Sequence, residues 1–211
     1  MPLTLIVALS YLLGSIPFGY LLVRGLRGKD VRQTGSGNIG ATNVSRTSPT
    51  LGFVTLLLDG LKGAGAVLLA AHLFPGNTKL EAIAALFAIL GHVFPWWLKF
   101  RGGKGVATLF GMVLAIQPIV AGSCVIVFLA VLYLTRYISL SSILAGVALP
   151  ICVLWIYNEK EVFYRVFAVA VAGLIILTHQ KNISRLIRGN ESRVPILKHR
   201  DRKKSRRKIK V

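Results

Sequence analysis

The sequence predicts an all-α polytopic membrane protein with about seven transmembrane helices, some short or broken, around a groove at the cytoplasmic face. Of the 211 residues, 54% are hydrophobic and only 16% are charged, and the mean hydropathy is +0.66. Soluble domains carry about 25% charged residues, so this composition favours a membrane protein. The 26 Lys and Arg residues outnumber the seven Asp and Glu residues and gather between the apolar stretches.

Six apolar stretches are candidate membrane helices, at residues 3–23, 51–74, 80–97, 106–133, 140–157 and 162–177. A helix needs about 20 residues to cross roughly 30 Å of hydrocarbon, so most of them fit one crossing each. The fourth is too long for one crossing and too short for two. Pro118 lies near its middle, where a proline ends one helix or begins another. Splitting the stretch there predicts seven crossings.

The basic residues predict the orientation. Residues 24–50, 96–104 and 179–211 carry five, three and thirteen Lys or Arg, whereas residues 75–79 and 158–161 carry one each. The positive-inside rule places basic segments in the cytoplasm, so seven crossings put the N-terminus outside and the C-terminus inside. We expect residues 1–191 to form one membrane domain and residues 192–211 a disordered basic tail on anionic lipid. Because topology and lipid explain the charge, no nucleic-acid partner is expected.

The short helix predicted over residues 105–116 covers only about 18 Å at 1.5 Å per residue. Its start is therefore expected below the membrane surface, where irregular backbone survives only if protein or a polar cavity covers it. The turn before it contains Gly102, Gly103, Lys104 and Gly105. Free amides and the positive dipole end of a helix suit a phosphate, so this turn is a candidate phosphate site. The alternative is a basic flank that only sets topology.

A second candidate phosphate site is the glycine-rich loop at residues 35–43. It matches GxGxxG, but a dinucleotide fold needs a preceding strand, and here the flanks are membrane helices. Its glycines permit close backbone approach to an anion, and Arg46 follows closely enough to clamp the same anion. An ordinary flexible loop is the alternative. The candidate phosphate-binding residues of this loop are Ser36, Gly37, Asn38, Thr42, Asn43 and Arg46.

Two further pairs carry polar chemistry. His179 and Asn182 are three residues apart after the last span and so share a helix face, although a lone histidine there is often structural. Asp59 and Lys62 have the same spacing inside the second span. Intramembrane charges are costly and usually pair, so these two either brace the site or contact substrate.

The common catalytic and metal-binding patterns are missing from the sequence. It contains no Gly-x-Ser-x-Gly elbow, no His-x-x-x-x-Asp pair, no close carboxylate pair and no metal-ligand cluster. Cys124 and Cys152 lie in apolar runs and are expected to be inert. We therefore expect no metal and no cofactor, and substrates that bring much of the reactivity themselves.

These motifs together resemble one enzyme family. The residues that carry the resemblance are Gly35 to Asn43 with Arg46; Leu58, Asp59, Lys62 and Gly63; Gly91, His92 and Pro95; Phe100 and Gly102 to Gly105; and His179, Asn182, Ile183, Arg185, Leu186, Gly189 and Glu191. In order and spacing they resemble the bacterial acyl-phosphate:glycerol-3-phosphate acyltransferases, the PlsY family, over roughly residues 10–191. Gln180 and Lys181 depart from the expected arginine, and the basic tail is an extension.

The resemblance implies transfer of a fatty acyl group from acyl phosphate to the 1-hydroxyl of glycerol 3-phosphate, in the bacterial cell membrane. It implies that Ser36, Arg46 and Lys104 hold phosphates, that the amides of residues 102–105 cradle the acyl phosphate, and that His179 and Asn182 orient the glycerol. Lys104, His179 and Asn182 would be the catalytic residues of a reaction without an enzyme nucleophile. Membrane lipids and an enzyme that makes acyl phosphate are the expected partners.

A transporter of an organic phosphate is the alternative function. It would explain the broken helix and the cationic face equally well. A transporter is expected to have polar residues along a path through the membrane and, in many cases, two related halves. The sequence contains no internal repeat, and its outward-facing segments are nearly devoid of charge, which favours the acyltransferase.

Overall fold

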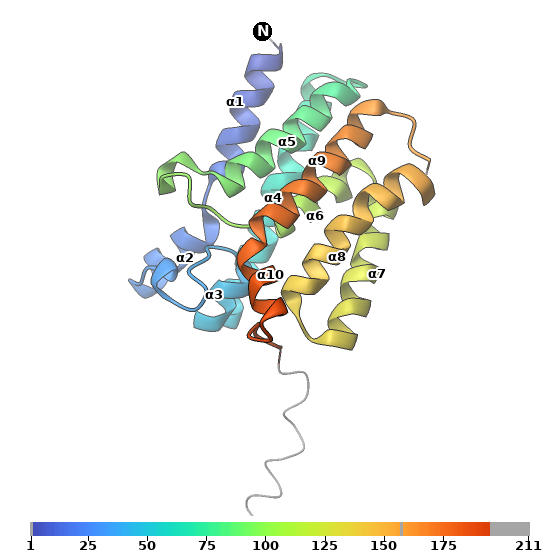
Figure 1. The fold of residues 1–211 in the computed structure, drawn as a ribbon. Helices are drawn as coiled ribbons and strands as arrows, with labels where there is room; N and C mark the ends of the chain where they lie inside the picture. The colour runs from blue at the N-terminus through green and yellow to red at the C-terminus, as the bar shows by residue number, and fades with distance from the viewer. Residues whose placement is uncertain (1, 157, 195–211) are drawn as a thin grey trace, which may run out of the picture.

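The computed structural model describes residues 2–156 and 158–194, and every regular element in these ranges is helical (Figure 1). In chain order the elements are α1 (Pro2–Ser15), α2 (Phe18–Arg27), η1 (Val31–Gln33), α3 (Ala41–Thr47), α4 (Pro49–Leu73), α5 (Thr78–Val93), η2 (Trp96–Leu98), α6 (Val106–Ile116), α7 (Pro118–Thr135), α8 (Ile138–Ile151), η3 (Cys152–Ile156), α9 (Val162–Thr178) and α10 (Gln180–Ile187). The predicted all-α class is confirmed.

Short polar side chains and prolines set several helix ends. Ser48 and Asn77 precede α4 and α5, and each side chain accepts a hydrogen bond from the amide three residues on, at 3.5 and 3.1 Å. Such N-caps satisfy amides that the helix leaves unpaired. Pro17 separates α1 from α2, and Pro118 begins α7. The predicted break of the fourth apolar stretch at Pro118 is therefore confirmed.

The structure has fewer clear membrane-crossing helices than the seven expected. Five stretches are long and apolar enough to cross a membrane: Pro2–Arg27, Pro49–Leu73, Thr78–Leu98, Pro118–Thr135 and Ile138–Ile156. The pair α9 and α10 meets at 58° and can count as a sixth, and α6 is a shorter apolar helix of 11 residues. The N-terminus and α10 lie at opposite ends of the bundle, as an odd number of passes requires (Figure 1).

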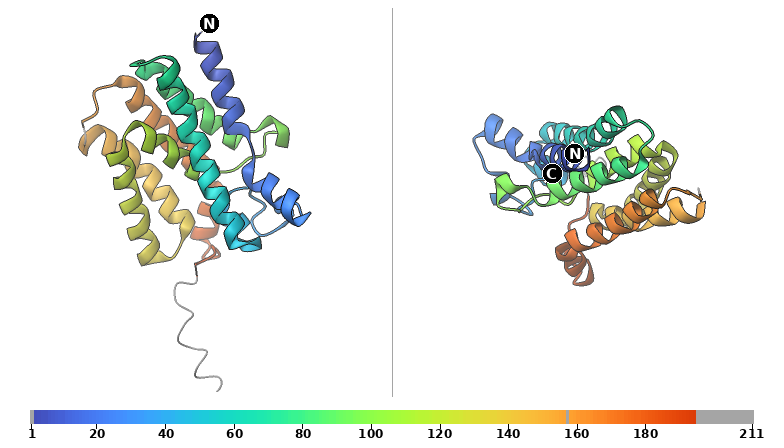
Figure 2. Two further views of the ribbon diagram at one scale, coloured as in Figure 1. Left: turned by 180° about the vertical axis from the view of Figure 1, so that it is seen from behind. Right: turned by 90° about the horizontal axis from the view of Figure 1, so that it is seen from above.

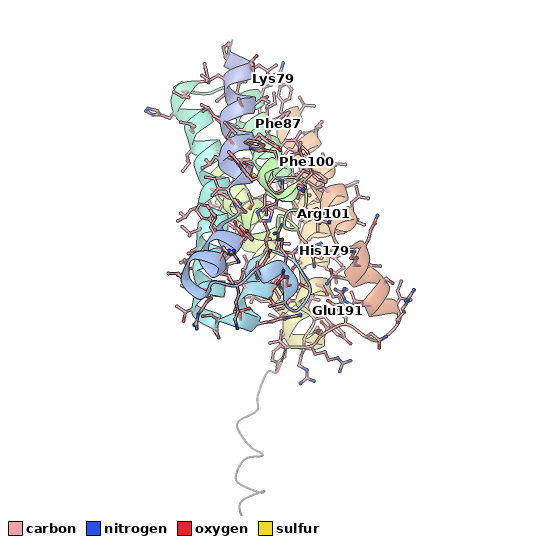
Figure 3. All side chains as sticks on the ribbon, turned by 90° about the vertical axis from the view of Figure 1, so that its left-hand side faces the viewer. Lys79, Phe87, Phe100, Arg101, His179 and Glu191 are labelled. Carbon is pink, nitrogen blue, oxygen red and sulfur yellow. The ribbon has the colours of Figure 1, made fainter. Side chains whose placement is uncertain are left out.

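Helix α6 begins in the interior of the bundle. Figure 3 shows Phe100 and Arg101, in the segment that leads to α6, between the end that carries Lys79 and the end that carries Glu191. Helix α4 runs the length of the bundle beside it (Figure 2). The sunken turn that the short helix predicted is thus present.

A close helix contact sets the depth and position of α6. A Cβ added to Gly63 on α4 would overlap the carbonyl oxygen of Thr108 in the first turn of α6, so any side chain at this glycine would push the two helices apart. Above this contact, Ile89, Met112 and Ile175 are fully buried in the main apolar core. The first turn of α6 is therefore held by packing on both sides.

The outer surface of the bundle is apolar. Only 11% of the apolar window in α7 is buried within the protein, and Ile119, Ile126 and Leu129 on this helix are each more than half exposed. Helix α7 lies at the edge of the bundle (Figure 2). A soluble protein would not leave a whole helix uncovered in this way, so this surface faces lipid.

The last described residues pack against the turn between α7 and α8. The amide of Val194 donates to the carbonyl of Arg136 at 2.8 Å, and the guanidinium of Arg193 lies 4.9 Å from the Tyr137 ring. Residues 192–194, which the sequence assigned to the tail, are thus in contact with the membrane domain. The rest of the expected tail, residues 195–211, lies outside the described residues.

The arrangement predicts accessibility from opposite sides of the membrane. Lys29 and Lys79 are both exposed, and they lie on the two sides of the crossing formed by α4. In a background with Cys124→Ala and Cys152→Ala, single cysteines at these two positions should react with a membrane-impermeant thiol reagent from opposite faces of sealed vesicles. Labelling of both from the same face would contradict the topology.

Candidate active site

A cavity of about 430 Å³ brings the predicted motifs together. It lies where α3, α4, the start of α6, α8 and α10 meet. The predicted site residues on its wall are Ser36, Asn38, Thr42, Asn43, Arg46, Asp59, Lys104, Gly105, His179 and Asn182. Gly37, Gly102, Gly103 and Lys62 were also predicted, but they are not among the residues that line this cavity. Segments more than 140 residues apart in the chain, such as those of Ser36 and His179, therefore form one site.

A chain of hydrogen bonds fixes the side of the cavity formed by α10. The Lys104 ammonium donates to Asn182 Oδ1 at 2.5 Å, and Asn182 Nδ2 donates to Glu191 Oε1 at 2.7 Å. Glu191 also accepts from Ser139 Oγ at 2.7 Å and from Arg185 Nε at 2.5 Å. The orientation of the Asn182 amide is thus set by a donor on one side and an acceptor on the other.

The charges in this chain are perturbed by burial. Burial lowers the pKa of the Lys104 ammonium to about 8; the Glu191 carboxylate opposes this shift, and the guanidinium groups of Arg185 and Arg46 add to it. Burial by itself would raise the pKa of Glu191, but hydrogen bonds from Arg185, Ser139 and Asn182 outweigh it and leave this pKa below its ordinary value. An added anion would favour the charged form of Lys104.

The Asn43 side chain holds the first glycine-rich loop in place through hydrogen bonds to its backbone. It is 1% exposed. Its Nδ2 donates to the carbonyls of Val31, Thr34 and Asn38 at 2.9 to 3.1 Å, and its Oδ1 accepts from the Ser36 amide at 2.8 Å. The expectation that Asn43 binds a phosphate directly is therefore corrected, because its amide hydrogens are already shared among three carbonyls.

The groups left for a ligand on this side are the Ser36 hydroxyl, the Thr42 hydroxyl and the Arg46 guanidinium. All three residues are exposed to the cavity. Among the described residues, no hydrogen bond or ion pair occupies the Arg46 guanidinium. Arg46 is thus available for a bidentate contact with an anion.

In the second glycine-rich turn, the amides differ from the expectation. The Gly102 amide donates to the Val93 carbonyl and the Gly103 amide to the His92 carbonyl, each at 3.0 Å. The prediction that these two amides cradle a phosphate is therefore wrong, since both hold the turn against the end of α5. Among the described residues, the amides of Lys104 and Gly105 donate to no protein group, and neither do those of the first turn of α6 after Gly105, which turns the chain at a φ of 84°. Helix starts leave such amides unpaired.

His179 has a defined tautomer. Its Nδ1 lies 2.8 Å from the carbonyl oxygen of Ile175, which can only accept, so Nδ1 carries the hydrogen. In the neutral imidazole Nε2 is then an acceptor. The side chain lines the cavity while the residue is 2% exposed (Figure 3).

Asp59 and Lys62 form the intramembrane ion pair that their spacing suggested. Lys62 Nζ lies 2.8 Å from Asp59 Oδ1 and donates to the Ile16 carbonyl at 2.7 Å. Of the two alternatives left by the sequence, the bracing role fits Lys62, because its ammonium is turned to the break between α1 and α2 and away from the cavity.

One wall of the cavity is apolar. It consists of Leu56, Val106, Ala107, Phe128 and Ile138. Phe128 belongs to α7, the helix that faces lipid. A ligand with a charged head and an apolar tail matches this division.

Sequence reasoning did not single out several residues on the wall of the cavity. Ser139, Ser142, Phe128 and Arg193 sit in stretches that read as plain membrane helix or basic tail, and no local signal marks them. Arg185 and Glu191 did appear in the matching motifs, but the pairing of Glu191 with Asn182 needs the turn after α10.

The charge balance of the cavity selects anions. Asp59 is paired with Lys62, and Glu191 with Arg185. Arg46, Lys104 and Arg193 then leave the wall with an excess of positive charge. With donors at the start of α6 and an acceptor at His179, the site can bind a phosphate and hold a hydroxyl beside it.

Comparisons with known proteins agree with this geometry. The family described as glycerol-3-phosphate acyltransferase matches residues 4–189. A glycerol-3-phosphate acyltransferase from Myxococcus xanthus is 46% identical over 190 residues, covering 89% of this chain and 97% of the relative. One from Agrobacterium fabrum is 45% identical over 196 residues, covering 91% and 92%.

Solved structures are also similar. A crystal structure of PlsY (YgiH), an integral membrane glycerol 3-phosphate acyltransferase, in its glycerol 3-phosphate form, has a TM-score of 0.86 and 37% identity, covering 92% of this chain and 96% of that one. Its lysophosphatidic acid form has a TM-score of 0.83. On the family match, the curated relatives and these structures, the chain belongs to the glycerol-3-phosphate acyltransferase family.

Proposed function

We propose that this protein transfers a fatty acyl group from acyl phosphate to the 1-hydroxyl of glycerol 3-phosphate, giving lysophosphatidic acid and phosphate. The observation that carries the proposal is the cavity that Arg46, Lys104 and the start of α6 line together with apolar side chains. Family membership supports the acyl transfer to glycerol 3-phosphate. The choice of acyl phosphate as donor follows the resemblance to the PlsY family, and a mixed anhydride is activated enough to need no enzyme nucleophile.

The phosphate groups have two sets of donors. Arg46 with the Ser36 and Thr42 hydroxyls forms one set, and Lys104 with the first amides of α6 forms the other. Each combines positive charge with hydrogen bonding, the pattern that phosphate oxygens require. We assign Asn43 to support of the first set and the amides of Gly102 and Gly103 to support of the second, in place of direct contact.

In the reaction, the 1-hydroxyl oxygen of glycerol 3-phosphate attacks the acyl carbonyl carbon. The bond from this carbon to the phosphate oxygen breaks, and the departing phosphate takes the hydroxyl proton. His179 Nε2 accepts a hydrogen bond from the hydroxyl and, with Asn182, orients the glycerol, while Lys104 holds the phosphate side. Lys104 neutralises charge that grows on the departing phosphate, so it contributes most in the transition state.

The acyl chain lies along the apolar wall that ends at α7, where it can enter from the lipid. We place the end of the bundle that carries α2, α3 and α10 in the cytoplasm of a bacterial cell, because the basic segments before α4 and after α9 lie there (Figure 1). Glycerol 3-phosphate is water-soluble and enters from this face. The reaction also requires a partner enzyme that supplies acyl phosphate.

The transporter alternative has less support. The relatives are named acyltransferases, and the family match covers residues 4–189. A transporter would move organic phosphate across liposomes and would form no lysophosphatidic acid from palmitoyl phosphate and glycerol 3-phosphate in detergent. Product formation by the purified protein therefore tests the proposed function directly.

Lys104 is the residue on which the reaction depends most. Removing a charge-assisted hydrogen bond from a buried anion costs about 1.5–3 kcal/mol. Lys104→Ala should therefore lower kcat/KM at least about 10–100-fold, measured with palmitoyl phosphate and labelled glycerol 3-phosphate. Lys104→Arg should restore only part of this, because a planar guanidinium does not replace a compact ammonium in a tight turn.

The matched control for this test is Lys29→Ala, since Lys29 is an exposed basic residue away from the cavity. Its kcat/KM should stay within about 3-fold of wild type. Wild-type kinetics in a folded Lys104→Ala variant would place the site elsewhere.

The lowered pKa of Lys104 predicts an alkaline limb in the rate profile. The ammonium is charged below about pH 8 and loses its proton above it. The wild-type kcat/KM should therefore fall as pH rises through the region of this pKa, measured between about pH 6 and about pH 10. In Lys104→Arg the guanidinium stays charged throughout, so this limb should be absent or displaced upward. The same limb in both enzymes would assign it to another group.

A further inference from the structure

Three buried ionisable residues have no place in the proposed reaction, although two of them, Asp59 and His92, line the cavity. Asp59, Lys62 and His92 are 2%, 4% and 4% exposed. Charged groups at this depth are costly unless they pair. An apolar replacement for a buried ion pair is often as stable as the pair itself, so stability alone does not account for this cluster.

One end of the cluster touches the break between α1 and α2. Lys62 Nζ donates to the Ile16 carbonyl at 2.7 Å, and it lies 5.6 Å from the Phe18 ring on the far side of the break. It also pairs with Asp59 Oδ1 at 2.8 Å. Lys62 therefore links Asp59 to the Ile16 carbonyl at the helix break, which also accepts the Phe18 amide at 3.1 Å.

The other end of the cluster touches both sides of Lys104. The His92 carbonyl accepts the Gly103 amide at 3.0 Å, and the His92 ring occupies the space that a side chain on Gly103 would need. His92 Nδ1 lies 3.2 Å from Thr108 Oγ1 in the first turn of α6. The same atom lies 3.7 Å from Asp59 Oδ1.

From these contacts we infer that His92 is a positioning residue for acyl transfer. It holds Gly103 and Thr108, the residues on either side of Lys104, and thereby places the Lys104 ammonium and the first amides of α6 at the cavity. Asp59 and Lys62 hold the imidazole in place. The inference rests on the proposed function, because the group that His92 positions is the one assigned to the phosphate.

The imidazole suits this task better than an apolar side chain of similar size. Its flat ring fits against the backbone of Gly103, and its Nδ1 at the same time reaches Thr108. An apolar replacement would fill the space but leave the Thr108 hydroxyl without this partner. Asparagine places an amide group near the position of Nδ1 and keeps the polar contact.

The test compares His92→Ala, His92→Asn and a matched control, His72→Ala, at an exposed histidine on α4. Kinetics are measured with palmitoyl phosphate and glycerol 3-phosphate, and thermal unfolding of the detergent-solubilised protein is followed in parallel. His92→Ala should lower kcat/KM about 10-fold, His92→Asn should recover part of the loss, and His72→Ala should match wild type. If His92→Ala lowers only the unfolding temperature, the positioning role is refuted.

A double-variant comparison separates positioning through Lys104 from an independent effect. In the Lys104→Ala background, the ammonium is already gone, so adding His92→Ala should lower kcat/KM by about 3-fold or less. Two losses that multiply in full would show that His92 does not act through Lys104.

Should His92→Ala fail to fold, Thr108→Val removes the same hydrogen bond with little change of shape and should lower kcat/KM about 3-fold. An unchanged rate in that variant would contradict the inference.

Wild-type turnover distinguishes this inference from the proposed function. If the wild-type protein forms no lysophosphatidic acid under these conditions, the proposed function itself fails. If wild type is active and the folded His92 and Thr108 variants are as active as the His72 control, only the positioning role fails.

Discussion

The first turn of α6 presents unpaired backbone amides in the interior of a bundle whose outer surface is apolar. In lipid such amides need partners from the protein or from a polar cavity, because no water reaches them. The cavity, the cationic wall and the hydrogen-bond chain from Lys104 to Glu191 all surround this turn. In the proposed function an anionic substrate pairs with these amides, so the feature that would destabilise an empty membrane helix becomes the proposed binding site.

The buried charges are neutralised locally and leave a defined excess. Lys62 pairs with Asp59, and Arg185 with Glu191, so neither carboxylate competes with a bound phosphate for Arg46 or Lys104. This pairing explains how a site that binds anions tolerates two acidic residues on its wall. Each carboxylate also has a neighbour that it helps to hold. Glu191 orients the Asn182 amide, and Asp59 lies beside the His92 ring.

Residue type and spacing anticipated which segments come together. The three motifs do meet in one cavity, the break at Pro118 is present, and α6 starts at depth. Prediction from sequence failed where a hydrogen-bond partner comes from elsewhere in the chain. The sequence does not show that the backbone amides of Gly102 and Gly103 donate hydrogen bonds to the end of α5. It also does not show that the Asn43 side-chain amide donates to carbonyls of its own loop.

By itself, the sequence determined the membrane class, the helix breaks, the basic face and the residue types that suit phosphate, because these depend on local composition and proline chemistry. Only the tertiary structure decided which donors remain available and how they are held. Lys104 reaches Asn182 across 78 residues of chain, and His92 supports its turn from a different helix. Such contacts depend on how closely α4, α5 and α6 pack, and a one-dimensional pattern does not contain that distance.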